Sequence, residues 1–351
     1  MIFFDGIIYS LQRHGGISVY FNELIKRSFS RDVSFHAVVH SGAAEHASLL
    51  PGNVVKRNLR LFERYRNCSI FENTNLFHSS YYRLPNRPVV TVTTVHDFTY
   101  ERLVKGGRRW LHSWQKFNAI RNSHAIICIS ENTRNDLLYF LPEVPPDRIH
   151  VIHNGVGDAF FQLETKCESV MTRPFVMFVG ARGGYKGFSF VVEVLARLPN
   201  LGLVCVGGGP LSTVEQALVN KHINGRCKHF LNISDENLNK LYNKAYCLAY
   251  PSSYEGFGIP VVEAMRAGCP VVAFNGSSIP EIAGGSALLF DQLDSSALEA
   301  AFKCLEDTEV RMKLRLKGLN QSRLFSWEKT VEQTLCVYDK VKFLLPSKKN
   351  L

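Results

Sequence analysis

The sequence of 351 residues lacks a segment long enough to cross a membrane and lacks an export signal. Its longest apolar runs, such as Val89 to Val95 and Ala125 to Ile129, are of strand length, whereas a spanning helix needs roughly 20 apolar residues. The N-terminal stretch has no basic region ahead of its apolar residues and no small-residue cleavage site. We therefore expect a water-soluble protein of the cytoplasm.

Patterns that bind metals are also missing. The nine cysteines form no CxxC pair, and no cluster of Cys and His ligands suits zinc. No two aspartates are two positions apart, so the sequence has no Asp-x-Asp motif that could bind a metal. We expect no metal and no cofactor, and we interpret the cysteines as reduced, buried packing residues.

The composition is that of a folded globular protein, with 46% hydrophobic and 21% charged residues. At this length two domains are the usual outcome. The formal net charge of +10 implies an anionic partner, which can be a nucleic acid, an anionic membrane surface or a phosphorylated ligand. No nucleic-acid-binding motif accompanies the charge, so we expect no nucleic acid among the partners.

Apolar strand-like runs alternate with polar turns and helix-period segments, a pattern typical of parallel sheets with crossover helices. The alternation lapses in the polar stretch from Gln162 to Pro174 and resumes at Phe175. We predict an α/β protein of two tandem doubly wound Rossmann-like domains, residues 1–165 and 175–326, facing a cleft. The helix expected over 327–345 is long enough to cross back onto the first domain.

Strands are expected in both predicted domains, separated by helices. In the first domain they are Ile2–Phe4, Ser34–Val39, Leu76–His78, Val89–Val95, Ala125–Ile129 and His150–Ile152. In the second they are Phe175–Gly180, Leu201–Gly207, Lys228–Leu231, Cys247–Tyr250 and Val271–Ala273.

The segment EGFGIPVVE places Glu255 and Glu263 eight positions apart around a Gly-Phe-Gly turn. A helix is expected to start at Ile259, with Glu263 two turns into it. A helix N-terminus beside two glycines offers backbone N–H groups and a positive dipole end, which suit a diphosphate. Glu263 has apolar neighbours, and a buried carboxylate needs partners, so a solvated role fits it poorly.

This segment resembles the E-x7-E motif of the family-4 (group 1) retaining glycosyltransferases, which have the GT-B fold. The resemblance to this family extends to four other segments: Gly15 to Tyr20, Cys128 to Leu138, Arg148 to Val156 and Ser277 to Asp291. The resemblance covers nearly the whole chain and implies a retaining hexosyltransferase. It also implies a nucleotide diphosphate sugar as donor, with GDP-mannose as the first expectation and UDP-sugars and dTDP-rhamnose as alternatives.

The resemblance further implies roles for single residues. Glu255 would contact hydroxyls of the donor sugar and Glu263 the ribose, and both roles fit the strength of hydrogen bonds to carboxylates. The backbone of four turn residues would hold the sugar and phosphates: Gly256, Phe257, Gly258 and Ile259.

A second motif, FVGARGGYKGF, places Arg182 and Lys186 on a glycine-rich turn after a strand. It does not have Walker A spacing. The resemblance implies that this basic pair neutralises the departing diphosphate in place of a metal; a solvated basic loop is the alternative. The nearby GGGP segment, Gly207 to Pro210, lacks dinucleotide-binding spacing and is interpreted as a strand-to-helix turn.

Three further residues are expected in the first domain. Gly15 and Gly16 precede a helix, and the resemblance implies that their loop lies against the donor phosphate. His96 follows a strand and therefore emerges at the carboxyl edge of its sheet. A lone histidine is more often structural, but its placement matches the active-site histidine of the family, which hydrogen-bonds the donor sugar.

The stretch from Arg102 to Arg121 contains six Lys or Arg and no acid. Trp110, Trp114 and Phe117 recur at helical spacing, which indicates a core stripe with a solvated basic face. The alternative is a surface around Arg108, Arg109 and Lys116 that rests on anionic lipid beside a lipid-linked acceptor.

These observations favour a metal-independent glycosyltransferase that extends a lipid-linked or lipopolysaccharide-type glycan, such as an O-antigen, at the inner face of the cytoplasmic membrane. Two alternatives remain open. One is a sugar-nucleotide epimerase on the same fold, which would use no acceptor. The other is a nucleotide-sugar-binding regulatory protein without activity.

Overall fold

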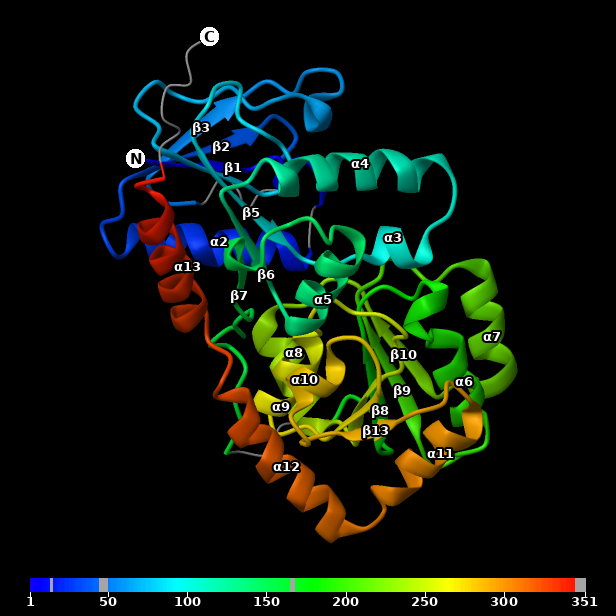
Figure 1. Ribbon diagram of the computed structural model, residues 1–351. Coiled ribbons are helices and arrows are strands. Elements are labelled where there is room, and N and C mark those ends of the chain that lie inside the picture. Colours follow the sequence, from blue (N-terminus) through cyan, green and yellow to red (C-terminus); the bar gives the residue numbers. More distant parts are fainter. Residues whose placement is uncertain (13–14, 44–49, 165–167, 345–351) are drawn as a thin grey trace. The chain divides into compact units, whose positions relative to one another are not determined.

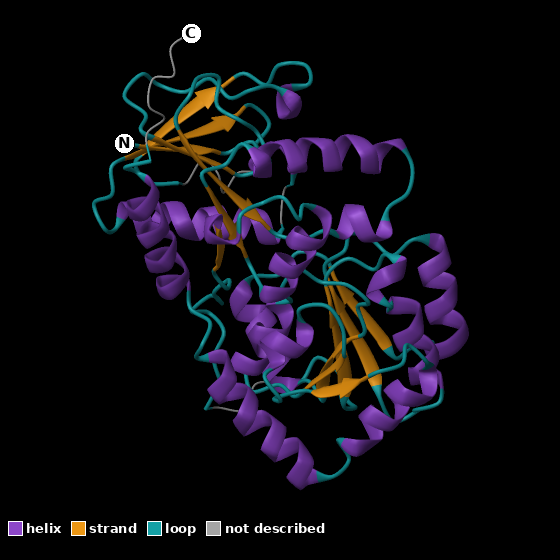
Figure 2. Ribbon diagram, in the orientation of Figure 1, coloured by secondary structure: helices purple, strands orange, loops and turns teal. Residues whose placement is uncertain are grey.

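The computed structural model describes residues 1–12, 15–43, 50–164 and 168–344, and the chain divides into two compact units. The first unit is Met1–Gly155 together with the chain from Trp327 onward, and the second is Val156–Ser326. Each unit contains one parallel sheet covered by helices, which Figure 2 shows in orange and purple. The predicted α/β class with two doubly wound domains is confirmed.

The first unit contains a seven-stranded sheet in the order β3-β2-β1-β4-β5-β6-β7, with every neighbouring pair parallel. Strand order reverses between β1 and β4, and such a switch point is where doubly wound sheets bind ligands. The strands are β1 Ile2–Asp5, β2 Phe35–His40, β3 Asn53–Arg57, β4 Leu76–Ser79, β5 Val90–Val95, β6 Ala125–Cys128 and β7 Ile149–Val151. Its helices are α1 Ile8–Leu11, α2 Gly16–Phe29, η2 Glu63–Tyr65, α3 Thr99–Leu103, α4 Gly107–Arg121, α5 Glu131–Phe140, η3 Pro146–Arg148 and α13 Trp327–Val341.

The second unit contains a six-stranded parallel sheet in the order β10-β9-β8-β11-β12-β13. Its strands are β8 Phe175–Val179, β9 Gly202–Val206, β10 Cys227–Phe230, β11 Cys247–Tyr250, β12 Val271–Phe274 and β13 Leu288–Phe290. Its helices are η4 Gly184–Lys186, α6 Phe188–Ala196, α7 Thr213–Ile223, α8 Asp235–Lys244, α9 Ile259–Arg266, α10 Ile279–Ala283, α11 Ser295–Cys304 and α12 Thr308–Ser322.

Helix α13 belongs to the first unit although it follows the second in sequence. Its buried side chains Trp327, Val331 and Tyr338 join the same core as Phe21 and Leu24 of α2. Figure 1 shows α13, in red, beside the blue α2. The chain therefore returns to its first unit through hydrophobic packing.

The structure places the domain boundary earlier than the predicted one. Val156 forms a β-bridge with Ser326. The N–H groups of Phe161 and Leu163 donate to Asn239 and Asn243 of α8, at 3.1 and 2.8 Å. Residues 156–164 are thus held by the second unit, whereas the sequence had assigned them to the first domain and the start of a linker.

The cysteine interpretation holds only in part. Within the described ranges, Cys68, Cys128, Cys205, Cys247 and Cys269 are buried, Cys227 is half-buried, and Cys304 and Cys336 are exposed. The two exposed cysteines lie on helices, Cys304 as the last residue of α11 and Cys336 within α13.

In the part of the chain that the structure describes, no helix is long and apolar enough to span a membrane.

Candidate active site

The Gly-Phe-Gly turn of the second unit follows β11 and leads into α9. Two serines hold it: Ser277 Oγ accepts from the N–H of Glu255 at 2.9 Å, and Ser278 Oγ donates to the carbonyls of Glu255 and Phe257 at 3.1 and 3.0 Å. Gly258 caps the helix with a φ of 96°, and a Cβ there would lie 2.7 Å from Cδ1 of Ile279. Only glycine fits this position, since both backbone and space exclude a side chain.

Two charged residues that the sequence places in separate motifs meet beside this turn. The Nζ of Lys186, on η4, lies 2.6 Å from Oε1 of Glu255. Their side chains are 19% and 11% exposed, so solvent reaches both. Beneath them, burial and the Glu255 carboxylate raise the pKa of Tyr250 well above its usual value. The structure therefore joins an ammonium and a carboxylate at the helix N-terminus.

Glu263 is the fifth residue of α9, so it lies little more than one turn into the helix rather than two. Its Oε2 accepts a hydrogen bond from the hydroxyl of Tyr242 at 3.0 Å. Burial, with a contribution from Asp235, raises the pKa of Glu263 to about 7. A carboxyl group that titrates near neutrality responds to any ligand that hydrogen-bonds its ionised form.

Arg182 is engaged by the protein itself. Its Nε donates to Glu215 at 3.0 Å, and its other two nitrogens donate to carbonyls of the Gly207–Pro210 turn at 2.7 to 3.2 Å. That segment is the strand-to-helix turn predicted from the sequence, with left-handed φ angles at its three glycines. The structure thus gives Arg182 a loop-holding role, because all three guanidinium nitrogens already donate to acceptors within the chain.

His96 lies in the first unit, immediately after β5, and is 6% exposed. Burial lowers its pKa to about 4, with Lys116 adding to the effect and Asp97 opposing it. The Tyr20 ring packs edge-on against the imidazole at 5.3 Å. The buried Nε2 of this neutral imidazole has no hydrogen-bond partner among the described residues.

Gly15 is the N-cap of α2, and Gly16 is the first residue of that helix, one position earlier than expected. The Gly15 carbonyl accepts from Ser18 Oγ at 2.8 Å and from the N–H of Val19 at 3.1 Å. Because both residues are glycines, they have no side chain that could cover the N–H groups of the first turn of α2. A helix start of this kind presents backbone N–H groups to an anion.

Helix α4 does not bury its three aromatic residues as a core stripe: Phe117 is half-buried, but Trp110 and Trp114 face outward. Trp110 and Trp114 are 70% and 53% exposed, whereas Lys116 is fully buried. The Nζ of Lys116 lies 2.7 Å from Oε2 of Glu101, an acid just outside the basic stretch. The side chain of Arg108 lies outside the described part. The basic face proposed around Lys116 is therefore wrong at that residue.

Several contributors to the site escaped the sequence analysis. Tyr242 and Tyr250 lie beneath the two glutamates, and Ser277 and Ser278 hold the turn. The segments AYPSSY and SSIPE contain three of these residues, next to strand ends, but nothing local shows which turn they contact.

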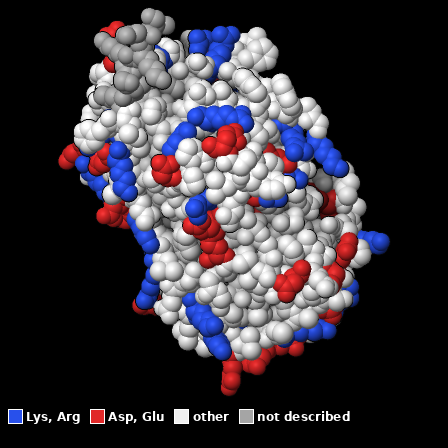
Figure 3. Space-filling model, in the orientation of Figure 1, with Lys and Arg blue, Asp and Glu red and all other residues white. Residues whose placement is uncertain are grey.

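On the face shown in Figure 3, basic and acidic side chains are interspersed rather than gathered into one field.

Two parallel Rossmann-like units, the second with a glutamate-bearing glycine turn at the start of a helix, define the class of proteins with the GT-B fold. Models of two families match the chain, Glycosyltransferase Family 4 over residues 14–160 and Glycosyl transferases group 1 over residues 162–321. The chain belongs to this family of group 1, family-4 glycosyltransferases.

Curated relatives include the O-antigen chain mannosyltransferase B of Escherichia coli, 27% identical over 75% of this chain and 74% of the relative. The alpha-maltose-1-phosphate synthase of Mycolicibacterium smegmatis is 29% identical over 67% and 68%. The MMP alpha-(1->4)-mannosyltransferase of Mycolicibacterium hassiacum is 29% identical over 72% and 65%.

Solved structures share the fold at low identity. Sucrose-phosphate synthase from Thermosynechococcus elongatus superposes with a TM-score of 0.78 and 18% identity, covering 98% of this chain and 99% of that one. Anabaena HepE in complex with UDP-glucose gives 0.77 and 16%, covering 97% and 99%.

Proposed function

We propose that this glycosyltransferase moves a hexose from a nucleoside diphosphate sugar to a glycan acceptor, with retention and without a metal. The observation that carries the proposal is the Lys186–Glu255 pair, 2.6 Å apart, beside the turn that begins α9. A carboxylate for sugar hydroxyls, an ammonium for phosphate and a helix N-terminus are there combined in one turn.

The second unit would bind the donor. Glu255 accepts hydrogen bonds from sugar hydroxyls, and Glu263 accepts them from the ribose. The backbone of Gly256, Phe257, Gly258 and Ile259 holds the sugar and phosphates. Lys186 has three N–H donors, so it can contact Glu255 and a phosphate together. Arg182 contributes by shaping the Gly207–Pro210 turn.

The first unit would supply His96, Gly15 and Gly16. Because its pKa is lowered to about 4, the imidazole of His96 is neutral at pH 7, and its Nε2 can hydrogen-bond a hydroxyl of the donor sugar. The N–H groups that open α2 interact with the donor phosphate.

Transfer with retention is proposed to take place on one face of the sugar. The acceptor hydroxyl oxygen bonds to the anomeric carbon as the bond from that carbon to the phosphate oxygen breaks. The acceptor proton passes to the departing diphosphate, whose charge Lys186 stabilises. No enzyme nucleophile and no metal are required in this scheme.

GDP-mannose is the first donor to test, since two of the three relatives described above are named mannosyltransferases. UDP-sugars follow because a structural neighbour was solved with UDP-glucose. The purified protein is incubated with GDP-mannose, UDP-glucose and dTDP-rhamnose, with and without lipid-linked acceptor, and the product anomer is assigned by NMR. We expect an α-linked product that forms equally in EDTA. Turnover that EDTA abolishes and Mn²⁺ restores would overturn the metal-free assignment.

The acceptor is proposed to be a lipid-linked or lipopolysaccharide-type glycan, with the protein peripheral at the inner face of the cytoplasmic membrane. Support comes from α4, which exposes Trp110 and Trp114 beside the exposed Arg109 and Arg121. Exposed tryptophans next to basic residues are typical of interfacial helices.

Tryptophan emission tests this surface directly, because the protein has three tryptophans and the third, Trp327, is buried. Anionic liposomes should shift the emission to the blue, and salt should reverse the shift. Trp110→Ser with Trp114→Ser should abolish it and weaken binding. Equal binding by the double variant would remove α4 from the membrane surface.

A further inference from the structure

A charged lysine is enclosed inside the first unit. Lys116 has no exposed surface, although lysine is almost never fully buried without a partner. Its Nζ donates to Oε2 of Glu101 at 2.7 Å and to the main-chain carbonyl of Asp97 at 2.8 Å. The ring of Phe98 lies 4.6 Å from the same atom. The ammonium is thus satisfied by a carboxylate, a carbonyl and an aromatic face.

The partner carboxylate is ionised and similarly enclosed. Burial alone raises the pKa of Glu101, but the His112 ring and Lys116 lower it to about 2. Ser113 Oγ donates to the other oxygen of Glu101 at 2.8 Å. Glu101 lies on α3, whereas Lys116, His112 and Ser113 lie on α4. The pair therefore ties α3 and α4 together from the inside.

The same lysine reaches the turn that carries His96. The carbonyl that accepts from Lys116 is that of Asp97, the residue directly after His96. The Asp97 carboxylate accepts from the N–H of Thr99 at 2.9 Å, at the start of α3. Residues 96–99 are consequently fixed at two points, one by Lys116 and one by α3. An apolar side chain in place of Lys116 would fill the same space and leave the Asp97 carbonyl without this donor.

We infer that Lys116 is a positioning residue, which with Glu101 holds the His96–Asp97 turn in the orientation that directs the imidazole to the donor sugar. The inference rests on the proposed transfer reaction for its effect on turnover, but not for its structural part. It also makes α4 a helix with two faces of different use, since its exposed aromatic residues and its buried lysine lie on opposite sides.

The test variant is Lys116→Met with Glu101→Gln, which keeps the side-chain lengths and leaves no buried charge unpaired. Amide hydrogen exchange across residues 96–103 should quicken at least about tenfold, while β6 stays protected. Turnover should fall about 10- to 100-fold, because small displacements of a contacting group are costly, with donor KM within about twofold. The split between kcat and KM follows because the proposed donor-binding residues lie mainly in the second unit.

The matched control is Ile120→Ala on the same helix. Ile120 is fully buried, and its apolar side chain makes no hydrogen bond or ion pair to the His96–Asp97 turn. It loosens α4 without removing the ammonium, and its kcat should stay within about twofold of the parent. Equal loss of kcat in the control, or unchanged exchange at 96–103 in the test variant, overturns the positioning role. If the parent transfers no sugar at all, the proposed function fails, and the exchange measurement still decides whether Lys116 fixes the turn.

Discussion

Ion pairs of nearly equal length occur in both units, but they differ in what surrounds them. In the first unit, Arg83 donates to Asp5 at 3.0 Å and to Glu63 at 2.7 Å, and the three side chains are 0 to 4% exposed. In the second unit, Lys186 and Glu255 are 2.6 Å apart at 19% and 11% exposure. The two sites therefore share closely spaced opposite charges, and they differ in how far solvent reaches those charges.

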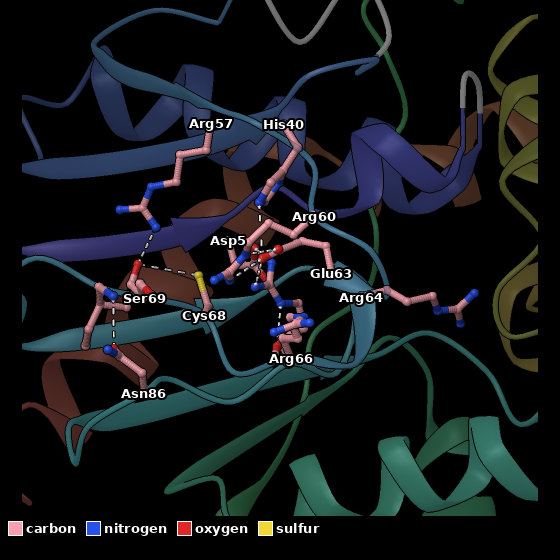
Figure 4. A network of polar contacts seen from close by, with 12 residues as sticks. Asp5, His40, Arg57, Arg60, Glu63, Arg64, Arg66, Cys68, Ser69 and Asn86 are labelled. Carbon is pink, nitrogen blue, oxygen red and sulfur yellow. Dashed lines mark hydrogen bonds and ion pairs between the residues drawn. The ribbon is translucent and has the colours of Figure 1, made fainter.

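The arginine network shows what a structural role requires. As Figure 4 shows, Asp5, His40 and Glu63 gather around one point at the strand ends, and Arg60 reaches the same glutamate. Arg83 donates further to the Arg66 carbonyl at 2.9 Å. Lys186, by contrast, carries its charge at the tip of a flexible chain near the surface. A guanidinium fixed from several sides stabilises the fold, whereas a reachable ammonium suits a ligand.

The largest expected effect is on stability and comes from Arg83→Met. It leaves Asp5 buried without its cation and Glu63 with Arg60 as its remaining one, which should cost about 3–5 kcal/mol of unfolding free energy. Urea unfolding measures the loss. Lys186→Met, which removes a partly exposed pair, should cost about 1 kcal/mol or less. Equal losses in the two variants would erase the distinction between the sites.

The next effect is on turnover. Lys186→Met should lower kcat about 10²–10³-fold, the usual cost of removing one group that stabilises transition-state charge. Arg197→Met is the control, because Arg197 pairs with Glu299 in the same unit at 45% exposure. The control should turn over like the parent. A Lys186 variant as active as this control would show that Lys186 does not stabilise the charge of the departing diphosphate.

The smallest effect is the pH dependence of donor binding through Glu263. Its pKa of about 7 means that most molecules carry the protonated form at pH 6 and the carboxylate at pH 8. Ribose hydroxyls donate to the carboxylate, so donor affinity should rise with pH, about tenfold between pH 6 and 8. Calorimetric titration of the donor measures it.

Two variants at this position separate charge from contact. Glu263→Gln should bind the donor with little pH dependence over the same range. Glu263→Ala should raise donor KM more than it lowers kcat, because it removes binding common to ground and transition states. A parent protein whose donor affinity is flat between pH 6 and 8 would show that Glu263 does not contact the ribose.

Most strands were predictable because buried parallel strands are continuous apolar runs. The two that the sequence analysis missed, β3 and β13, lie at sheet edges. Strand β3 is half-exposed and includes Lys56 and Arg57, and β13 has only three residues. The other two edge strands, β7 and β10, were predicted, so the edge position alone does not explain the misses. Strand β3 buries too little of its surface, and β13 has too few residues, to give the apolar run on which the prediction depends.

Helix α4 shows where periodicity becomes ambiguous. Its pattern separates an aromatic stripe from a basic one, and hydrophobicity alone points the aromatic stripe inward. The structure places Trp110 and Trp114 outside because Glu101 supplies a buried partner for Lys116. That partner lies on another helix, so no count along α4 identifies the inward face.

The two parallel domains, the glycine turn before α9 and the family could be predicted from local signals, namely strand runs, turn residues and motif spacing. Three contacts became visible in the folded chain alone: Lys186 meets Glu255, 69 positions away, Arg182 is occupied by the Gly207–Pro210 turn, and Lys116 is buried. The physical reason is that a charged side chain takes its role from the partner it reaches. Parallel topology brings the partners of Lys186 and Arg182 together at the ends of different strands, and the packing of α3 against α4 brings Glu101 to Lys116.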